Sequence, residues 1–447
     1  MVVFFTKDDA TVYAVDTDHQ FDAAEIERLQ WLFGGAQLLS GADNLAGAYT
    51  GPRKEMISPW STNAVEITQN MGLSGISRIE EFHKVPCGEE PVFDPMLQTV
   101  YHSPGSDVFA IGESPAAAVE IDDISEYNSR EGLALSADEE GYLSELAKRL
   151  GRKLTDSEVF GFSQVNSEHC RHKIFNGTFI IDGEEMPSSL FGLIKRTSKA
   201  NPGRLVSAYK DNVAFVEGPA IWQFSPECGD KPSYFTEKKI PAVLSLKAET
   251  HNFPTTVEPF NGAATGSGGE IRDRLGGGRA SLPLAGTAVY MTSYPRFELA
   301  DDPKWRYTSK PRKWLYHNPA DILIKASNGA SDFGNKFGQP LICGSLLTFE
   351  HEEKGSVWGY DKVIMLAGGV GFAAARDAIK GEPEPGQAVV IAGGDNYRIG
   401  MGGGAVSSVD TGRYAGAIEL NAVQRANPEM QKRVANLIRA LAEGGLN

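Results

Sequence analysis

The order of hydrophobic and polar positions divides the chain into regions with different periodicities. Early in the chain, short runs such as TVYAVDT (11–17) alternate like β-strands, whereas FDAAEIERLQWLFGG (21–35) has a helical period. Asp22 can cap this helix, and a glycine pair ends it. Three apolar residues share its inner face: Ile26, Leu29 and Phe33. GPRKEMISPWSTNAVEI, from Gly51, predicts an ordered loop leading into a helix, so residues 1–120 are predicted to form a small α+β domain.

A helical pattern dominates from about residue 133 and predicts a linker of helices over residues 121–175. Two capping boxes mark helix starts, because in each a hydroxyl residue precedes a glutamate by three positions. They are Ser136 with Glu139, and Thr155 with Glu158. The first of these helices has a leucine stripe closed by a glycine: Leu143, Leu146, Leu150 and then Gly151.

Strand patterns return in residues 176–362, which we assign to a β-rich α/β domain. The runs are TFIID, LVSAYKDNVAFVEG, AVLSLKAE and AGTAVYMTS, and an Asn-Pro pair at 318–319 predicts a further helix. A change of composition near Val363 introduces two buried-strand runs, VIMLAGGVGF and AVVIAGGD. A second Asn-Pro pair at 427–428 starts the last helix. Residues 363–447 are therefore expected to begin another domain.

The composition of the chain argues against some classes of protein function. The 447 residues carry a net charge of −15, which argues against a sequence-independent nucleic-acid binder with a basic face. The four cysteines are scattered without a CxxC pair, which is typical of a reducing, cytosolic setting. The apolar run around 363–375 is too short and too rich in glycine to span a bilayer. We expect a soluble, cytoplasmic protein without a membrane or nucleic-acid partner.

The stretch AETHNFPTTVEPFNGAATGSGGEIRD (248–273) contains the main candidate chemistry. SLKAE reads as a strand, so Lys247 and Glu249 share one face, and a glycine-rich loop follows that ends at Asp273. Two carboxylates and a lysine could hold Mg²⁺ and a polyphosphate, while glycines let backbone N–H groups approach phosphate oxygens. The plainer alternative is a surface loop whose glycines only make turns. No GxxxxGK[ST] motif occurs, so a common P-loop is excluded.

Two other motifs leave alternatives open. GMGGGA (400–405) fits a dinucleotide-binding pattern, but five residues separate it from the preceding strand, so a glycine-rich packing turn is the stronger interpretation. NSEHCRH (166–172) suggests zinc, a helix cap, or a histidine that acts as acid–base at a shared site. The spacing matches no common zinc motif.

These motifs resemble phosphoribosylformylglycinamidine synthase in its long, single-chain form. NSEHCRHKIF, LKAETHNFPTTVEPFNGAATGSGGEIRD, GMGGGAVSS, GPRKEMISPWSTNAVEI and VQRANPEMQKR carry the resemblance, which covers nearly the whole chain. It implies an α+β protein with a small N-terminal domain, a helical linker, a first domain like the N-domain of aminoimidazole ribonucleotide synthetase, and the start of its C-domain. The second synthetase half and the glutaminase are expected to lie beyond Asn447.

The resemblance also implies a reaction and roles for residues. ATP would phosphorylate formylglycinamide ribonucleotide, and glutamine-derived ammonia would displace phosphate to give an amidine. His251 and His169 would be catalytic, Glu249 and Asp273 would hold Mg²⁺, and Thr250, Asn252 and Arg272 would bind the ribonucleotide. ATP would be bound by Lys247 and by the segment Gly262, Ala263, Ala264, Thr265, Gly266, Ser267, Gly268, Gly269, Glu270, Ile271, Arg272 and Asp273.

The sequence departs from the family pattern at two positions, and we assign no functional role to the residues there. Phe253 stands where part of the family has a second histidine, and His172 is a tyrosine in the short-chain form. We expect a fragment that is inactive alone and that could pair with a second copy through the LSLKAE sheet. The alternatives are a non-catalytic scaffold or nucleotide-binding fragment, and a zinc- or NAD-dependent enzyme.

Overall fold

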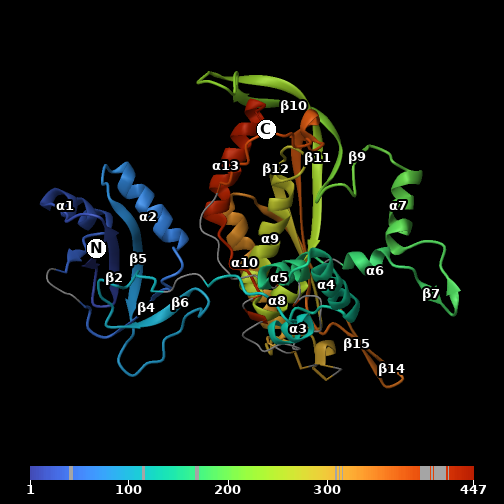
Figure 1. Ribbon diagram of the computed structural model, residues 1–447, viewed down its shortest axis with the longest axis horizontal. Helices are drawn as coiled ribbons and strands as arrows, with labels where there is room; N and C mark the ends of the chain where they lie inside the picture. The colour runs from blue at the N-terminus through green and yellow to red at the C-terminus, as the bar shows by residue number, and fades with distance from the viewer. Residues whose placement is uncertain are drawn as a thin grey trace. The chain divides into compact units, whose positions relative to one another are not determined.

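The computed structural model describes residues 1–39, 44–112, 116–166, 171–307, 310–311, 313–314, 316–392, 403, 406, 419–420 and 422–446. The chain forms two compact units, of which the first contains Met1–Ala117 and the second begins at Ala118. Both units combine sheets with helices (Figure 1), so the predicted α+β class is confirmed.

The first unit is a six-stranded antiparallel sheet in the order β3-β1-β2-β5-β4-β6, with helices α1 and α2. The elements are β1 (Val2–Thr6), β2 (Thr11–Thr17), α1 (Ala23–Leu32), β3 (Gln37–Leu38), β4 (Ala48–Pro52), α2 (Pro59–Asn70), β5 (Ile76–Lys84) and β6 (Gln98–His102). The helix predicted after Asp22 is confirmed as α1. Asp22 accepts a hydrogen bond from the backbone N–H of Glu25, and Leu29 is fully buried.

A buried ion pair on β5 organises the loop that was predicted to be ordered. Arg78 Nε lies 3.0 Å from Glu80 Oε1, and the Arg78 guanidinium donates to the carbonyls of Lys54 (2.7 Å) and Met56. Glu80 accepts a hydrogen bond from the backbone N–H of Ser58 at 2.9 Å. Ser58 in turn caps α2, so the loop and the helix start are held by one buried network.

The linker helices are α3 (Ile124–Glu131), α4 (Ala137–Leu150) and α5 (Asp156–Val165). Of these, α4 and α5 begin where the capping boxes predicted, and both capping boxes are formed. The leucine stripe on α4 is only partly inward, because Leu143 is buried whereas Leu150 is 51% exposed. The linker core therefore covers the N-terminal half of α4 better than its end.

The second capping box predicts an unusually acidic carboxyl group. Two guanidinium nitrogens of Arg152 lie 2.8 and 2.7 Å from the Glu158 carboxylate, and these contacts, followed by the Thr155 backbone N–H, lower the pKa of Glu158 to about 2. A lowered pKa means that the contact stabilises the fold above the ordinary value of 4.5 and is lost as the pH falls toward 2. Carboxyl NMR titration should give this value, and Arg152→Met should move it upward. An unchanged pKa in the variant would contradict the contact.

The second unit holds a six-stranded mixed sheet in the order β13-β12-β16-β11-β10-β9. Helix α9 packs on β11, β12 and β16, and α10 packs against α9. The elements after the linker are α6 (His172–Asn176), β7 (Ile180–Ile181), β8 (Glu184–Glu185), α7 (Leu190–Ala200), β9 (Leu205–Ser207), β10 (Ala214–Pro226), β11 (Phe235–Thr250), α8 (Asn252–Val257), α9 (Pro259–Leu275), β12 (Leu282–Thr292), η2 (Lys304–Tyr307), α10 (Pro319–Phe337), β13 (Leu341–Thr348), β14 (Glu350–Glu353), β15 (Ser356–Gly359), β16 (Ile364–Ala374), η3 (Ala375–Asp377) and α13 (Pro428–Gly444).

The helices expected at the two Asn-Pro pairs are confirmed as α10 and α13, each capped by its asparagine. Two other expectations were wrong. Strand β16 lies between β11 and β12, so the boundary expected at 362/363 falls inside one sheet. The described part of AVVIAGGD, residues 388–392, forms no strand, and Val389 to Ile391 are almost fully exposed. In the described part of the chain no strand pairs with this run, so its apolar side chains stay exposed.

Candidate functional site

The end of β11 and the last turn of α9 bring three charged residues together. Lys247 and Glu249 lie on one face of β11, because side chains alternate along a strand. Lys247 Nζ lies 2.6 Å from Asp273 Oδ2 on α9 and 4.0 Å from Glu249 Oε2. Their side chains are only 17 to 29% exposed. These three residues therefore form one charged cluster, in which the ammonium group of Lys247 lies between two carboxylates.

The two carboxylates of this cluster repel each other, and Lys247 offsets part of that repulsion. Burial raises the pKa of Glu249, Lys247 opposes that rise, and the negative charge of Asp273 adds to it. A divalent ion would relieve the repulsion between the two carboxylates. Among the described residues no group of three or more potential metal ligands occurs. Two carboxylates nevertheless fit Mg²⁺, which completes its octahedron with water and phosphate oxygens.

The glycine-rich segment was expected to be a loop, and this expectation was wrong. Residues 259–275 form helix α9, in which every position from Gly262 to Ile271 is buried. A Cβ at Gly269 would lie 3.1 Å from Glu249 Oε2, and one at Gly266 would lie 3.0 Å from His251 Cβ. The glycines therefore let the charged strand end approach the helix. They do not form an open cradle of N–H groups.

His251 is held against the start of this helix. Its Nδ1 donates to the Gly262 carbonyl at 2.6 Å, and its backbone N–H donates to the Met365 carbonyl of β16 at 2.9 Å. Because a carbonyl only accepts, the contact places the ring proton on Nδ1 and leaves Nε2 as the basic nitrogen of the neutral ring. The side chain is half-buried.

Two of the residues next to His251 in the sequence, Asn252 and Phe253, make contacts that support the fold. The Asn252 side-chain oxygen accepts from the Met365 backbone N–H at 3.1 Å, so this oxygen supports β16. Thr250 is exposed, whereas Phe253 is 4% exposed and packs in an apolar cluster with Val257. Phe253 is thus a core residue, which explains why an apolar side chain suits this position.

Arg272 lies at the exposed end of α9 and reaches another helix. Its Nη1 donates to Gln431 Oε1 of α13 at 3.2 Å, and its Nη2 lies 3.5 Å from the Thr265 carbonyl. A Cβ at Gly268 would lie 2.9 Å from Arg272 Nη1, so this glycine also makes room for a charged group. Arg272 is therefore placed to meet a ligand at the edge of the cluster.

Sequence reasoning missed a second set of residues that hold the cluster. Asn212 Nδ2 lies 3.4 Å from Asp273 Oδ1. Its neighbour Asp211 accepts from the Gly278 backbone N–H at 2.8 Å and from Lys380 Nζ at 2.6 Å. Both residues lie in LVSAYKDNVAFVEG, a run whose pattern predicts strands and no functional site. Its partners lie more than 60 positions away in the chain, so no local signal could reveal them.

A buried polar network fixes α9 from its other side. Arg274 is fully buried, and its Nε lies 2.8 Å from Glu270 Oε2. Its Nη1 donates to the Val370 carbonyl of β16 at 2.5 Å, while Gln339 Nε2 donates to Glu270 Oε1 at 2.6 Å. Burial raises the pKa of Glu270, and Arg274 opposes that rise. The network sets the position of the helix turn that carries Arg272 and Asp273.

The remaining sequence candidates lie in NSEHCRH and GMGGGA. His169 lies outside the described residues, as does most of GMGGGA. His172 is the exposed first residue of α6, with its ring edge against Phe191. In the described ranges, no helix is both long and apolar enough to cross a membrane.

Comparisons with known proteins identify two regions. Residues 10–104 match the family model for the N-terminal region of formylglycinamide ribonucleotide amidotransferase, and residues 124–173 match the model for its linker domain. These two matches lie in the same order as the small domain and the helical linker. The matched ranges stop short of the residues that form the charged cluster.

Solved structures give weaker likenesses. T. maritima PurL complexed with FGAR is 23% identical with a TM-score of 0.42, covering 68% of this chain and 37% of that chain. PurLQS from Thermotoga maritima is 21% identical with a TM-score of 0.37, covering 68% and 35%. AaThiL complexed with AMPPCP and TMP is 14% identical with a TM-score of 0.23, covering 41% and 42%. The matched region spans little more than a third of the PurL chain, and TM-scores this low assign neither a fold nor a ligand.

Proposed function

We propose that the chain is part of a formylglycinamide ribonucleotide amidotransferase, because residues 10–104 and 124–173 match the family models for the N-terminal region and the linker domain of that enzyme. It would convert formylglycinamide ribonucleotide to formylglycinamidine ribonucleotide with ATP and glutamine-derived ammonia, in the cytoplasm. The observation that carries the proposal is that two consecutive domain types match the same enzyme in order. A glutaminase and a second synthetase half would be its partners.

The charged cluster suits phosphoryl transfer. Bound Mg²⁺ would offset the negative charge of the transferring phosphoryl group. Glu249 and Asp273 would hold the ion, and Lys247 would contact ATP from between them. Arg272 would bind an anionic group of either substrate at the exposed end of α9.

Helix α9 would meet ATP first at its last turn, through Arg272 and Asp273, because the positions from Gly262 to Ile271 are buried. Behind this turn the hydroxyls of Thr265 and Ser267 are buried without a hydrogen-bond partner in the described part of the chain. Unsatisfied buried hydroxyls cost free energy, so a ligand that supplied a partner would be stabilised there.

His251 would manage protons when ammonia attacks. Its Nδ1–H is hydrogen-bonded to the Gly262 carbonyl. The Nε2 of the neutral ring can therefore accept a proton from the incoming nitrogen. His169 would be a second catalytic histidine, and Thr250 and Asn252 would bind the ribonucleotide. Asn212 would help to position the Asp273 carboxylate, which its side-chain amide contacts.

The sheet of the second unit supports a need for a second, similar domain. Leu246 of β11 and Leu284 of β12 are 42% and 49% exposed, and the edge strand β13 exposes Ile342 and Leu346. Uncovered apolar strands favour association. A second copy could therefore cover the sheet through β11. Sedimentation that gave only monomer at high concentration would contradict this self-dimer.

A nucleotide titration tests the proposed function. Calorimetry of the 447-residue chain with Mg²⁺–ATP should show binding that requires Mg²⁺, and Asp273→Ala should weaken it by about tenfold or more, equivalent to ~1.4 kcal/mol. Asp230→Ala removes an exposed carboxylate elsewhere in the second unit and should bind as the unchanged chain does. Equal binding by the Asp273 variant would contradict the assigned site, and no binding by any of the three would show that this chain has no working site alone.

A further inference from the structure

One long segment of the second unit has secondary structure but no buried residue. This arm, Arg171–Val206, contains α6, β7, β8 and α7, and none of its 36 positions is buried. Its apolar side chains are nevertheless numerous: Ile174, Phe175, Phe179, Ile180, Ile181, Met186, Leu190, Phe191, Leu193, Ile194, Leu205 and Val206. Large apolar residues normally contribute to a core, so this arm lacks a cover.

Helix α7 is the most ordered part of the arm. Ser189 caps it through the Gly192 backbone N–H at 3.1 Å. With only 11 residues it is shorter than helices that are stable alone in water, so its stability depends on packing of an apolar face. Leu193 and Ile194 on this helix are 42% and 43% exposed. The apolar face of α7 is therefore partly exposed to solvent.

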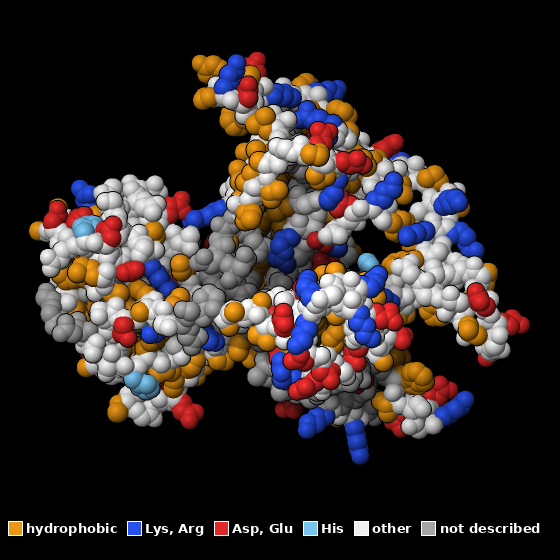
Figure 2. Space-filling view, viewed as in Figure 1, with side chains coloured by type: hydrophobic (Ala, Val, Ile, Leu, Met, Phe, Trp, Pro, Cys, Tyr) orange, Lys and Arg blue, Asp and Glu red, His pale blue; other side chains and the backbone are white. Residues whose placement is uncertain are grey.

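The C-terminal part of the arm is basic, in contrast to the chain as a whole. Residues 186–206 contain four cations and no carboxylate, whereas the whole chain has a net charge of −15. These cations are Lys195, Arg196, Lys199 and Arg204. Figure 2 shows lysine and arginine side chains gathered over α7. Arg204 has a carboxylate neighbour in the described part of the chain, Glu217 at 3.5 Å, and exposed pairs of this kind are weak.

Contacts between side chains hold part of this basic surface in place. Lys195 Nζ lies 5.5 Å from the centre of the Phe191 ring and 5.8 Å from that of Tyr209. Ser198 Oγ is 2.9 Å from the Tyr209 hydroxyl. The helix therefore presents ordered cations beside apolar side chains, and a surface that covers it must be both acidic and apolar.

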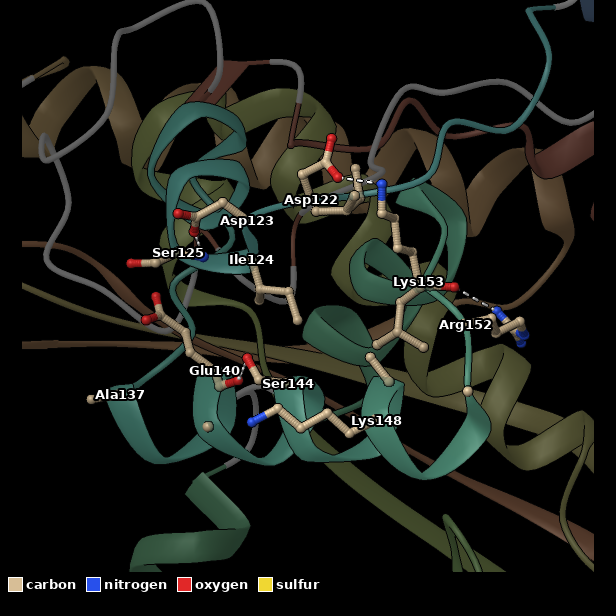
Figure 3. Close-up of a pocket in the computed structure, with 15 residues that line it drawn as sticks. Asp122, Asp123, Ile124, Ser125, Ala137, Glu140, Ser144, Lys148, Arg152 and Lys153 are labelled. Carbon is tan, nitrogen blue, oxygen red and sulfur yellow. Dashed lines mark hydrogen bonds and ion pairs between the residues drawn. The ribbon is translucent and has the colours of Figure 1, made fainter.

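The linker of the same chain offers such a surface. A groove of about 760 Å³ lies beside α3 and α4, with Ile121, Ile124 and Leu154 among its apolar lining (Figure 3). Asp123 and Glu140 lie toward one end and the Asp122–Lys153 ion pair toward the other. Residues 120–145 contain nine carboxylates and one arginine. The groove is therefore acidic at its α3 end.

We propose that α7 of one copy docks its apolar face in the α3–α4 groove of a second copy. Leu193 and Ile194 would cover the groove floor, and Lys195 and Lys199 would lie at the end with Asp123 and Glu140. An 11-residue helix is about 16 Å long and the 14-residue α4 about 21 Å, so the groove can hold the whole of α7. Laying an amphipathic helix in an apolar groove is a common recognition mode.

Charge complementarity favours a second copy over a nucleic acid. A nucleic-acid surface needs cations and stacking rings, but the apolar aliphatic side chains of α7 would remain uncovered on a phosphate backbone. In a two-fold pair both arms would dock at once, which doubles the buried area. This contact is separate from the apolar β11 sheet and does not depend on the proposed enzyme activity.

Salt dependence and charge reversal test the contact in the full 447-residue chain. Sedimentation at low salt should show self-association that weakens steeply as salt is added, because the rim contacts are charged. Lys195→Glu with Lys199→Glu should weaken this association about tenfold or more, since two attractions become repulsions. Ser144→Lys should weaken the association from the groove side, because Ser144 lines the groove. The Ser144 hydroxyl donates to the Glu140 carbonyl of the same helix in the described structure.

Mixing the variants provides the decisive comparison. An equimolar mixture of the arm double variant and Ser144→Lys should associate more tightly than either variant alone, because the reversed arm then meets an added cation. Association through the β11 sheet would persist in both variants and at high salt, which would overturn the proposal. A chain that is monomeric at all salt concentrations, or that binds RNA through Lys195 and Lys199 instead of itself, would overturn it as well.

Discussion

Replacing Arg274 by methionine should lower the free energy of unfolding of the second unit by about 3–5 kcal/mol, the range measured when one partner of a buried ion pair is removed. Arg274 is fully buried and bonds the Glu270 carboxylate, the Gln339 side chain and the Val370 carbonyl. Methionine fills a similar volume but donates no hydrogen bond. The Glu270 carboxylate would therefore lose its charged partner, and the Val370 carbonyl would lose its donor. Such a loss is a large part of the ~5–15 kcal/mol that keeps a domain folded.

Urea unfolding followed by circular dichroism measures this change. Arg204→Met provides the matched control, because Arg204 is exposed and its pair with Glu217 is long at 3.5 Å. It should leave the midpoint almost unchanged. Adding Glu270→Gln to Arg274→Met should recover part of the loss, because the buried charge is then gone. A midpoint for Arg274→Met that matched the Arg204 control would contradict the buried network.

Adding one methyl group at Gly262 should destabilise the same unit by about 2–3 kcal/mol, because overpacking a rigid contact forces the backbone to move. A Cβ at this position would lie 2.4 Å from the carbonyl carbon and oxygen of Pro254. These are backbone atoms of α8, so no side chain can rotate away. The shift would also displace the Gly262 carbonyl that accepts the His251 Nδ1–H.

Gly141→Ala is the matched control for this variant. Gly141 lies inside α4, and a Cβ there would have no atom within 4 Å. Alanine at an open helical position should stabilise by about 0.5–1 kcal/mol, so the two identical substitutions should have opposite signs. The NMR signals of the His251 ring should move only in the Gly262 variant, because only there does the carbonyl that accepts the Nδ1–H shift. Equal stability of the two variants would show that α8 and α9 are not in close contact.

Helix starts were predictable because their signals are local. Asp22, Ser136 and Thr155 each cap a helix through a backbone N–H two or three positions later, and that contact needs no distant partner. The Asn-Pro pairs before α10 and α13 act in the same way. Strand alternation likewise placed Lys247 and Glu249 on one face of β11.

Helix α9 could not be predicted from its residues. Four of its positions are glycine, which weakens a helix by about 1 kcal/mol at each position relative to alanine, so the sequence of this segment is typical of a loop. Burial against β11, β16 and α10 compensates for this weakness, and that packing requires glycine where neighbouring backbone or charged side chains come close. The same residue type that breaks an isolated helix permits this one.

The sequence by itself determined the helix starts, the α+β class and the charged residues of the candidate site. Only the tertiary structure decided that Asp273 lies beside Lys247, that Asn212 and Asp211 hold them in place, and that the glycines belong to a buried helix. It also showed that the arm around α7 is left without a cover. The physical reason is range: capping and alternation act over a few residues, whereas burial and ion pairing depend on chain segments that only folding brings together.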